Sequence, residues 1–354
     1  MKNTYFYRDK PIFGIDIGNG TIRIMQINGK PGNLTISGYS AGNFEPSAIK
    51  NGVIVEPQVI ANLIQMMLSH NLKGSINSKR IALALPAKRT YSRAIKLPKL
   101  EPEELESAIL LEAEQYIPVS IKSLYLDYNI ISQTETELEL FMVATPITII
   151  DSYMNLAKLL DFEPVLIETS IDSASRLFVQ THFGNVPSVL VDFGQESVDI
   201  TIVDGTIIAT GTVGGGGDNF TTRISDKLGV SPAEAHNIKT KYGLNISNKQ
   251  NEITMALDPQ LELLYKEIKR MIRYYEERTN NTKKINQIVI MGNGANLPGL
   301  ADRMTDVLRV PVQTSDPWQL FKYKKGLEPI PIEIRSSFIT AAGLAIAPPK
   351  EVFK

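Results

Sequence analysis

Cysteine is absent from the 354-residue sequence, which excludes disulfides, cysteine nucleophiles and thiolate metal sites. Histidine is scarce: His70, His182 and His236 are the only three, and they lie too far apart in sequence to favour a histidine-based metal centre. No charge of one sign dominates, because 37 Lys and Arg residues oppose 38 Asp and Glu residues. Without a basic face or tail, nucleic acid is not an expected partner.

Long apolar runs are also missing. No segment reaches the roughly 18 to 20 apolar residues that span a bilayer, and the N-terminus, MKNTYFYRDKPIF, lacks the apolar stretch of a signal peptide. The C-terminus, AIAPPKEVFK, is broken by Pro348 and Pro349 and is too short for an amphipathic membrane helix. The sequence therefore predicts a cytoplasmic protein whose contact with a membrane is indirect. Its length predicts two domains or more.

The sequence does contain three glycine-rich segments, each of which follows or ends a β-branched run. They are GIDIGNGTIRI at 14–24, VDFGQESVDI at 191–200 and VIMGNGANLPGL at 289–300. Small residues let backbone amides converge on phosphate oxygens. Asp16 and Asp192, at the ends of the first two strands, are placed to hold a hydrated magnesium ion. Together the segments predict a clamp on a polyphosphate, although the first alone fits an ordinary Asn-Gly hairpin turn equally well.

The first segment offers backbone amides at Gly18, Asn19, Gly20 and Thr21, and the side chain of Arg23 is expected to reach the same phosphates.

The second segment repeats this layout with Asp192 and Gly194. We interpret Glu196 as a solvated loop residue, because a carboxylate repels phosphate. Asp199 fits either a partner of the opposite loop or an edge charge.

In the third segment, Gly292, Gly294 and Ala295, with Asn293 among them, would let a base or ribose lie on bare backbone.

A further pair, His236 and Lys239, shares one face of a helix expected at 231–241 and is a candidate for ribose or phosphate contacts. A single histidine on a helix is otherwise usually structural.

Strand and helix patterns suggest two halves related by internal duplication, because hairpins open both residues 12–39 and the segment from 188. Between them, at about 87–166, the order strand-helix-strand-strand-helix predicts a small α+β unit inserted into a larger domain. Helices are also expected at 57–69, 258–279 and 336–347.

In this order the motifs resemble those of the actin-like ATPase superfamily. The insert, with EAEQYIP at 112–118 and LDY at 126–128, is similar to the 1C subdomain of the FtsA and PilM families, and to the PilM pattern in particular. The resemblance implies an α/β, actin-like (ribonuclease H-like) duplicated fold with an inserted α+β 1C (SHS2-like) subdomain. It implies subdomain 1A at 1–85, 167–186 and 335–354, 1C at 86–166, 2A at 187–222 and 282–334, and 2B at 223–281.

The resemblance also implies ATP and Mg²⁺ as ligands, with Asp16 and Asp192 at the metal. Arg23 stands where the superfamily has lysine, Asn293 where it has glycine and His236 where it has a carboxylate. The residues implied to contact the nucleotide are Gly18, Asn19, Gly20, Thr21, Arg23, Gly194, Gln195, Gly216, Gly217, His236, Lys239, Gly292, Asn293, Gly294 and Ala295.

PilM proteins are implied to reach the inner membrane by binding the short N-terminal cytoplasmic tail of PilN, a bitopic membrane protein, in a groove between 1A and 1C. Contacts with pilus motor ATPases and self-association are further expectations. An FtsA-like division protein is an alternative, disfavoured by chain length and by the lack of a C-terminal membrane helix, and a sugar kinase is more distant.

Two functions stay open at this point: a nucleotide-dependent assembly scaffold with slow or no hydrolysis, and a turnover ATPase. Turnover requires a group that orients the attacking water, and Glu168 and Asp172 are the only carboxylates of the expected linker helix at 168–176. We favour the scaffold, since the sequence has no Walker-type P-loop.

Overall fold

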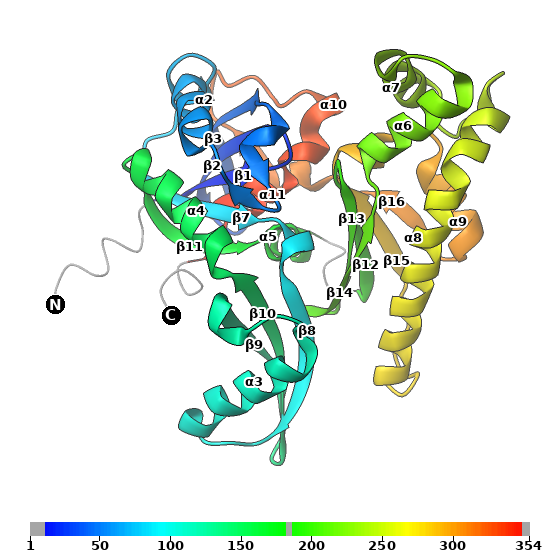
Figure 1. Ribbon diagram of the computed structural model, residues 1–354. Coiled ribbons are helices and arrows are strands. Elements are labelled where there is room, and N and C mark those ends of the chain that lie inside the picture. The colour runs from blue at the N-terminus through cyan, green and yellow to red at the C-terminus, as the bar shows by residue number, and fades with distance from the viewer. Residues whose placement is uncertain (1–10, 182–185, 349–354) are drawn as a thin grey trace.

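The computed structural model describes residues 11–181 and 186–348 (Figure 1). Residues 1–10, 182–185 and 349–354 lie outside this description, together with the expectations for the two termini and the corresponding parts of 1A. Among the described residues, no helix is both long enough and apolar enough to cross a bilayer.

The first half is built on a sheet that has seven strands within the described residues, in the order β11-β7-β1-β2-β3-β17, with β6 paired to β3. The strands are β1 (Phe13–Ile17), β2 (Thr21–Lys30), β3 (Asn33–Asn43), β6 (Lys73–Gly74), β7 (Arg80–Leu85), β11 (Glu163–Thr169) and β17 (Phe321–Tyr323). A small hairpin, β4 (Ile49–Lys50) and β5 (Val53–Ile54), lies beside it. Helices α2 (Pro57–Ser69) and α4 (Ile147–Leu159) share a hydrophobic core with one face of the sheet.

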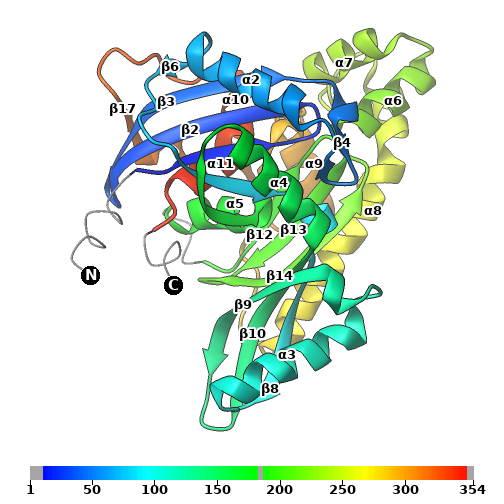
Figure 2. The same cartoon turned by 60° about the vertical axis from the view of Figure 1, so that its left-hand side comes forward.

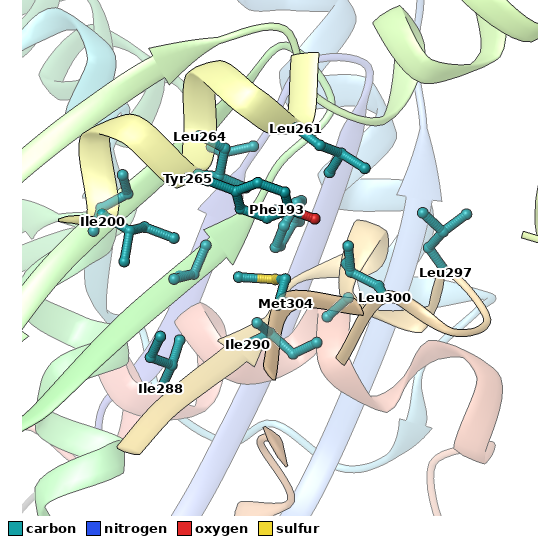
Figure 3. Packing of buried hydrophobic residues seen from close by; sticks show 14 of the residues in the cluster. Phe193, Ile200, Leu261, Leu264, Tyr265, Ile288, Ile290, Leu297, Leu300 and Met304 are labelled. Atoms are coloured by element: carbon teal, nitrogen blue, oxygen red, sulfur yellow. The ribbon is translucent and has the colours of Figure 1, made fainter. Parts of the chain in front are cut away.

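The second half has a sheet with the order β14-β13-β12-β15-β16. Its strands are β12 (Ser188–Phe193), β13 (Ser197–Val203), β14 (Ile207–Gly214), β15 (Gln287–Met291) and β16 (Val312–Thr314). Its helices are α6 (Gly217–Leu228), α7 (Pro232–Lys241), α8 (Gln250–Arg278) and α9 (Leu300–Leu308). Figure 3 shows Leu264 and Tyr265 of the long helix α8 above Ile288 and Ile290 of β15, with Met304 between the layers.

The two sheets repeat one pattern, which confirms the expected duplication. β1 pairs antiparallel with β2 and parallel with β7, as β12 pairs antiparallel with β13 and parallel with β15. Each first turn is closed by the same backbone bond: the Gly18 amide donates to the Thr21 carbonyl at 2.8 Å, and the Gly194 amide to the Ser197 carbonyl at 3.0 Å.

Two helices, α5 (Ser170–Val179) and α11 (Ile339–Ala345), lie between the sheets in a core that contains side chains from both. They touch backbone to backbone, because a Cβ at Gly343 would stand 2.0 Å from the Ser173 carbonyl oxygen. β1 approaches α11 equally closely: a Cβ at Gly14 would stand 2.3 Å from the Ala341 carbonyl oxygen. Side chains larger than hydrogen at these glycines would push the helices and the sheet apart.

The insert forms a separate layer below the two halves, beside β14 (Figure 2). It consists of a sheet ordered β8-β10-β9, namely β8 (Tyr91–Pro98), β10 (Glu137–Pro146) and β9 (Leu124–Gln133), covered by α3 (Pro102–Tyr116). It has its own hydrophobic core, which includes Ile95, Ile109 and Leu140.

Polar side chains help to tie the insert to the second half. Ser92 and Thr210 share a hydrogen bond between hydroxyls at 2.6 Å, and Arg278 at the end of α8 forms an ion pair with Glu139.

Most expected elements are present, including α2 and α3 at their expected bounds and the order strand-helix-strand-strand-helix. Two segments pack with a different part of the fold from the subdomain to which they were assigned. α4, placed in 1C, packs Tyr153 and Leu156 into the core of the first half. β17, placed in 2A, pairs with β3 of the first sheet. The four-part division itself stays a prediction.

Three expected helices have other bounds in the structure. The linker helix expected at 168–176 is α5, and Glu168 lies near the end of β11. α8 begins at Gln250 rather than 258, with Pro259 inside it. Burial of Ile253 and Leu257 in the core of the second half outweighs the backbone bond that this proline removes. The expected helix 336–347 is divided into α10 (Ile332–Arg335), a 3₁₀ turn (Ser336–Phe338) and α11.

Candidate functional site

The turns after β1 and β12 border the same cavity, which has a volume of about 330 Å³. All three glycine-rich segments reach it. The predicted residues that line it are Asp16, Gly18, Asn19, Thr21 and Arg23 from the first half, and Asp192, Gly194, Gln195, Gly292 and Asn293 from the second.

The first turn is held by its own backbone and side chains. Gly20 adopts a φ of 86°, in the left-handed region that favours glycine. The Arg23 guanidinium donates to Thr21 Oγ1 at 3.0 Å and lies 3.7 Å from the Asp16 carboxylate. Burial raises the pKa of Asp16, and the charge of Arg23 opposes this rise.

The second turn carries more negative charge than the first. Asp192 pairs with Asp199 in the strand register, at the position where Asp16 pairs with Arg23. Burial raises the pKa of Asp192 to about 7, and the charges of Asp199 and Asp16 add to the rise. Burial also raises the pKa of Asp199 to about 6, although a hydrogen bond from Thr212 and the charge of Lys88 oppose it. Asp199 lines the cavity, and its role as a partner of the opposite loop stays a prediction.

The third segment packs against the second turn. Gly292 has a φ of 79°, and a Cβ there would stand 2.3 Å from Asp192 Oδ1. A Cβ at Gly294 would stand 2.7 Å from Phe193 Cβ. Ala295 is buried and, like Gly294 and Gly20, does not line the cavity. Nucleotide contacts by these three residues stay a prediction.

Gly216 and Gly217 support the second turn from behind. The Gly217 amide donates to the Gly194 carbonyl at 2.9 Å, and a Cβ at Gly216 would stand 2.3 Å from the same oxygen. Neither residue lines the cavity. The structure thus gives them a role in fixing Gly194, and their contact with a ligand stays a prediction.

His236 and Lys239 of α7 also lie outside the cavity lining. His236 is exposed. Lys239 Nζ donates to the Gly217 carbonyl and to Thr221 Oγ1, both at 2.7 Å, and so joins α7 to the start of α6. Burial lowers the pKa of Lys239. Their role in ribose or phosphate binding stays a prediction.

The two candidate catalytic carboxylates are held by neighbours in the fold. Glu168 accepts from Arg176 Nη1 at 2.6 Å, and the same nitrogen donates to the Gly343 carbonyl at 3.1 Å. Asp172 caps α5 together with Thr169 in a reciprocal capping box. Neither carboxylate lines the cavity. Their role in orienting water stays a prediction.

Several cavity residues were not expected to contribute. Lys88 and Arg89 of a 3₁₀ turn (Ala87–Arg89) line it, as does Tyr153 of α4. Burial, together with the nearby charge of Asp16, raises the pKa of Tyr153. The sequence signal for Lys88 and Arg89 was a pair of cations shortly after the buried run RIALAL. This run forms β7, which lies parallel to β1 and ends at the same edge of the sheet.

Glu196 is an exposed loop residue, as interpreted, and it also lines the cavity. The Asn19 amide donates to Glu196 Oε1 at 2.8 Å, and Lys88 Nζ lies 3.9 Å from Glu196 Oε2. These contacts connect the first half with the second.

In the part of the chain that the structure describes, no group of three His, Asp or Glu side chains is arranged to hold a metal ion. Two carboxylates with waters and phosphate oxygens are nevertheless a usual magnesium environment. Burial and then the charges of Asp199 and Asp16 disfavour the charged form of Asp192, and a cation near Asp16 and Asp192 would favour it, so the donor set fits Mg²⁺.

Most of the chain matches the model of a known protein family. The model, described as Type IV pilus assembly protein PilM, matches residues 14–348. The chain belongs to the PilM family. It is therefore a PilM-type, actin-like protein of type IV pilus assembly, and the expected family is confirmed.

Solved structures show the same fold. A PilM–PilN type IV pilus biogenesis complex contains a chain with a TM-score of 0.80 and 21% identity, covering 96% of this chain and 100% of that one. The ethanolamine utilization protein EutJ from Carboxydothermus hydrogenoformans matches with a TM-score of 0.54 and 15% identity, over 94% and 88% of the two chains. MreB5 of Spiroplasma citri bound to AMPPNP matches with a TM-score of 0.53 and 12% identity, over 94% of each. The expected actin-like fold class is confirmed.

Proposed function

We propose that this protein is a nucleotide-dependent scaffold of the type IV pilus assembly platform, which binds ATP with Mg²⁺ between its halves. One observation carries the proposal: two equivalent hairpin turns, each with an aspartate at the strand end, face one cavity together with the third glycine segment. A volume of about 330 Å³ lies within the usual range for small-molecule sites. A related fold, that of MreB5, has been solved with AMPPNP bound.

In this proposal Asp16 and Asp192 hold the magnesium ion, which offsets the charge of the phosphates. Arg23, fixed by Thr21, lies beside the first turn and contacts a phosphate. The positions of Glu168 and Asp172 favour slow or no hydrolysis over turnover, since both carboxylates are engaged in holding α5.

Calorimetric titration with Mg²⁺–ATP tests the nucleotide site. We expect the wild type to bind and Asp16→Ala to lose binding, because the variant removes one of two metal ligands. Asp151→Ala is the matched control, since Asp151 is an exposed aspartate on α4 and does not line the cavity. Equal affinities for Asp16→Ala and the wild type would contradict the metal assignment.

We propose further that the partner is a PilN-like bitopic membrane protein, whose short cytoplasmic tail binds at the boundary between 1A and the insert. A similar chain has been solved in a PilM–PilN complex. The protein would then work at the inner membrane through this partner. The core of the insert is formed by its own side chains, which makes it a separate recognition unit.

Removal of the insert tests the partner site. Tyr91 and Ala144 are cross-strand neighbours, so a short glycine turn can replace residues 92–143 without disturbing α4. The shortened protein is expected to keep nucleotide binding and to lose a peptide from the N-terminal tail of the PilN-like protein. Undiminished peptide binding would contradict the proposed location.

A further inference from the structure

Lys88 belongs to none of the three glycine-rich segments and is not one of the two aspartates proposed to hold the metal ion. It follows β7, lines the nucleotide cavity, and also lines a second cavity of about 380 Å³ between the insert and β14. The 3₁₀ turn that carries it is where the chain leaves the first half for the insert. Lys88 therefore stands on the wall that the two cavities share.

The electrostatic surroundings of Lys88 come from the second half. Its Nζ lies 3.9 Å from Glu196 Oε2, and its charge is close enough to Asp199 to lower the pKa of that group. Glu196 in turn accepts a hydrogen bond of 2.8 Å from the Asn19 amide. A single carboxylate thus links two positions of the first half to the turn after β12.

The pair of Lys88 and Glu196 is readily exchanged. Their side chains are 38% and 53% exposed, and ion pairs open to water contribute little to stability. A phosphate group carries more charge than a carboxylate and has more acceptor oxygens. It can therefore displace Glu196 from Lys88 at small cost to the fold.

The other two cations of the cavity, Arg23 and Arg89, have partners within the first half. Arg23 lies beside Asp16 and donates to Thr21, and Arg89 donates to Asn51 Oδ1 at 2.9 Å. Four carboxylates line the cavity together with Arg23, Lys88 and Arg89. The carboxylates are Asp16, Asp192, Glu196 and Asp199. Lys88 is thus a cavity cation that pairs with an exposed carboxylate of the second half.

We propose that Lys88 binds the terminal phosphate of a nucleoside triphosphate in this cavity, and that phosphate displaces Glu196 from both Lys88 and Asn19. The link that Glu196 makes between the halves is then broken. The inference rests on the proposed nucleotide site. It adds that Lys88 distinguishes a nucleoside triphosphate from a diphosphate. Because Lys88 lies in the turn that leads into the insert, the bound nucleotide would contact that turn.

Titration of the full chain with Mg²⁺–ADP and with a non-hydrolysable Mg²⁺–ATP analogue tests the inference. We expect Lys88→Gln to weaken the analogue on the order of tenfold to hundredfold, as for a lost charge-assisted hydrogen bond. ADP affinity should change less than about threefold. Lys79→Gln is the matched control, because Lys79 pairs with Asp161 away from the cavity and is expected to leave both affinities unchanged.

Glu196→Gln is a second variant, which is expected to change the affinity for the ATP analogue in the opposite direction. It removes the negative charge that competes with phosphate, so the analogue should bind several-fold more tightly than to the wild type. An unchanged ratio of analogue to ADP affinity in both variants, with normal binding by the wild type, would overturn the inference and leave the nucleotide site intact. Failure of the wild type to bind either nucleotide would overturn both proposals.

Discussion

At alkaline pH and without ligand, the Asp192→Asn variant is expected to be more stable than the wild type. The carboxylate is buried next to Asp199 and Asp16, and its pKa is raised to about 7 from an ordinary 3.8. The folded state therefore binds this proton more tightly than the unfolded state does. Stability from this group is complete below about pH 4 and is lost as the pH rises through 7.

The size of the effect follows from the pKa. Between pH 5 and pH 7 the wild type loses about 1.4 kcal/mol per pH unit from this group, or roughly 3 kcal/mol in all. For a chain of this size that corresponds to about 6 °C in melting temperature, at about 2 °C per kcal/mol. The amide of the Asp192→Asn variant cannot ionise, so the variant should lack this component.

The assay is thermal unfolding of wild type and Asp192→Asn at pH 5, 6, 7 and 8, with and without Mg²⁺–ATP. The difference in melting temperature between variant and wild type should grow by about 6 °C from pH 5 to pH 8 without ligand. Ligand should shrink this difference by stabilising the wild type alone. Asp151→Asn, on the exposed face of α4, is the control. Parallel melting curves for Asp192→Asn and the wild type would refute the argument.

Three other variants test the supports of the cavity, each by thermal unfolding against the wild type. Glu168→Gln removes the charge of the carboxylate that accepts from the Arg176 guanidinium and should cost about 1–3 kcal/mol; no loss would show that the ion pair is dispensable. Gly343→Ala places a methyl group 2.0 Å from the Ser173 carbonyl oxygen and should cost about 1–3 kcal/mol, and a wild-type melting temperature would contradict this contact. Lys239→Met removes two hydrogen bonds to α6 and should cost about 1–2 kcal/mol while leaving ADP binding within threefold, whereas abolished binding with a normal melting temperature would favour a ligand contact instead.

The turns of the cavity were predictable because they depend on local sequence. A β-branched run followed by Asp and Gly predicts where a strand ends. This pattern occurs at Asp16 and again at Asp192, so two strand ends were predicted. Their meeting across one cavity follows from the duplicated fold. The first turn closes with the same backbone bond as the second, which a sequence pattern can indicate.

Residues whose role depends on the opposite half could not be predicted in this way. Glu196 occupies the cavity because Asn19, 177 positions earlier, donates to it. Helical periodicity predicted that Lys239 and His236 share one face of α7, but it could not predict which residues that face contacts. The start of α8 was missed for a related reason, since burial in the core overrides the local preference of Pro259.

The crossing of α5 and α11 limits how these two helices can move against each other. Since main chain touches main chain at Gly343, no side chain is available there to rearrange, and sliding would drive atoms into one another. Turning about that point is the movement with the least resistance.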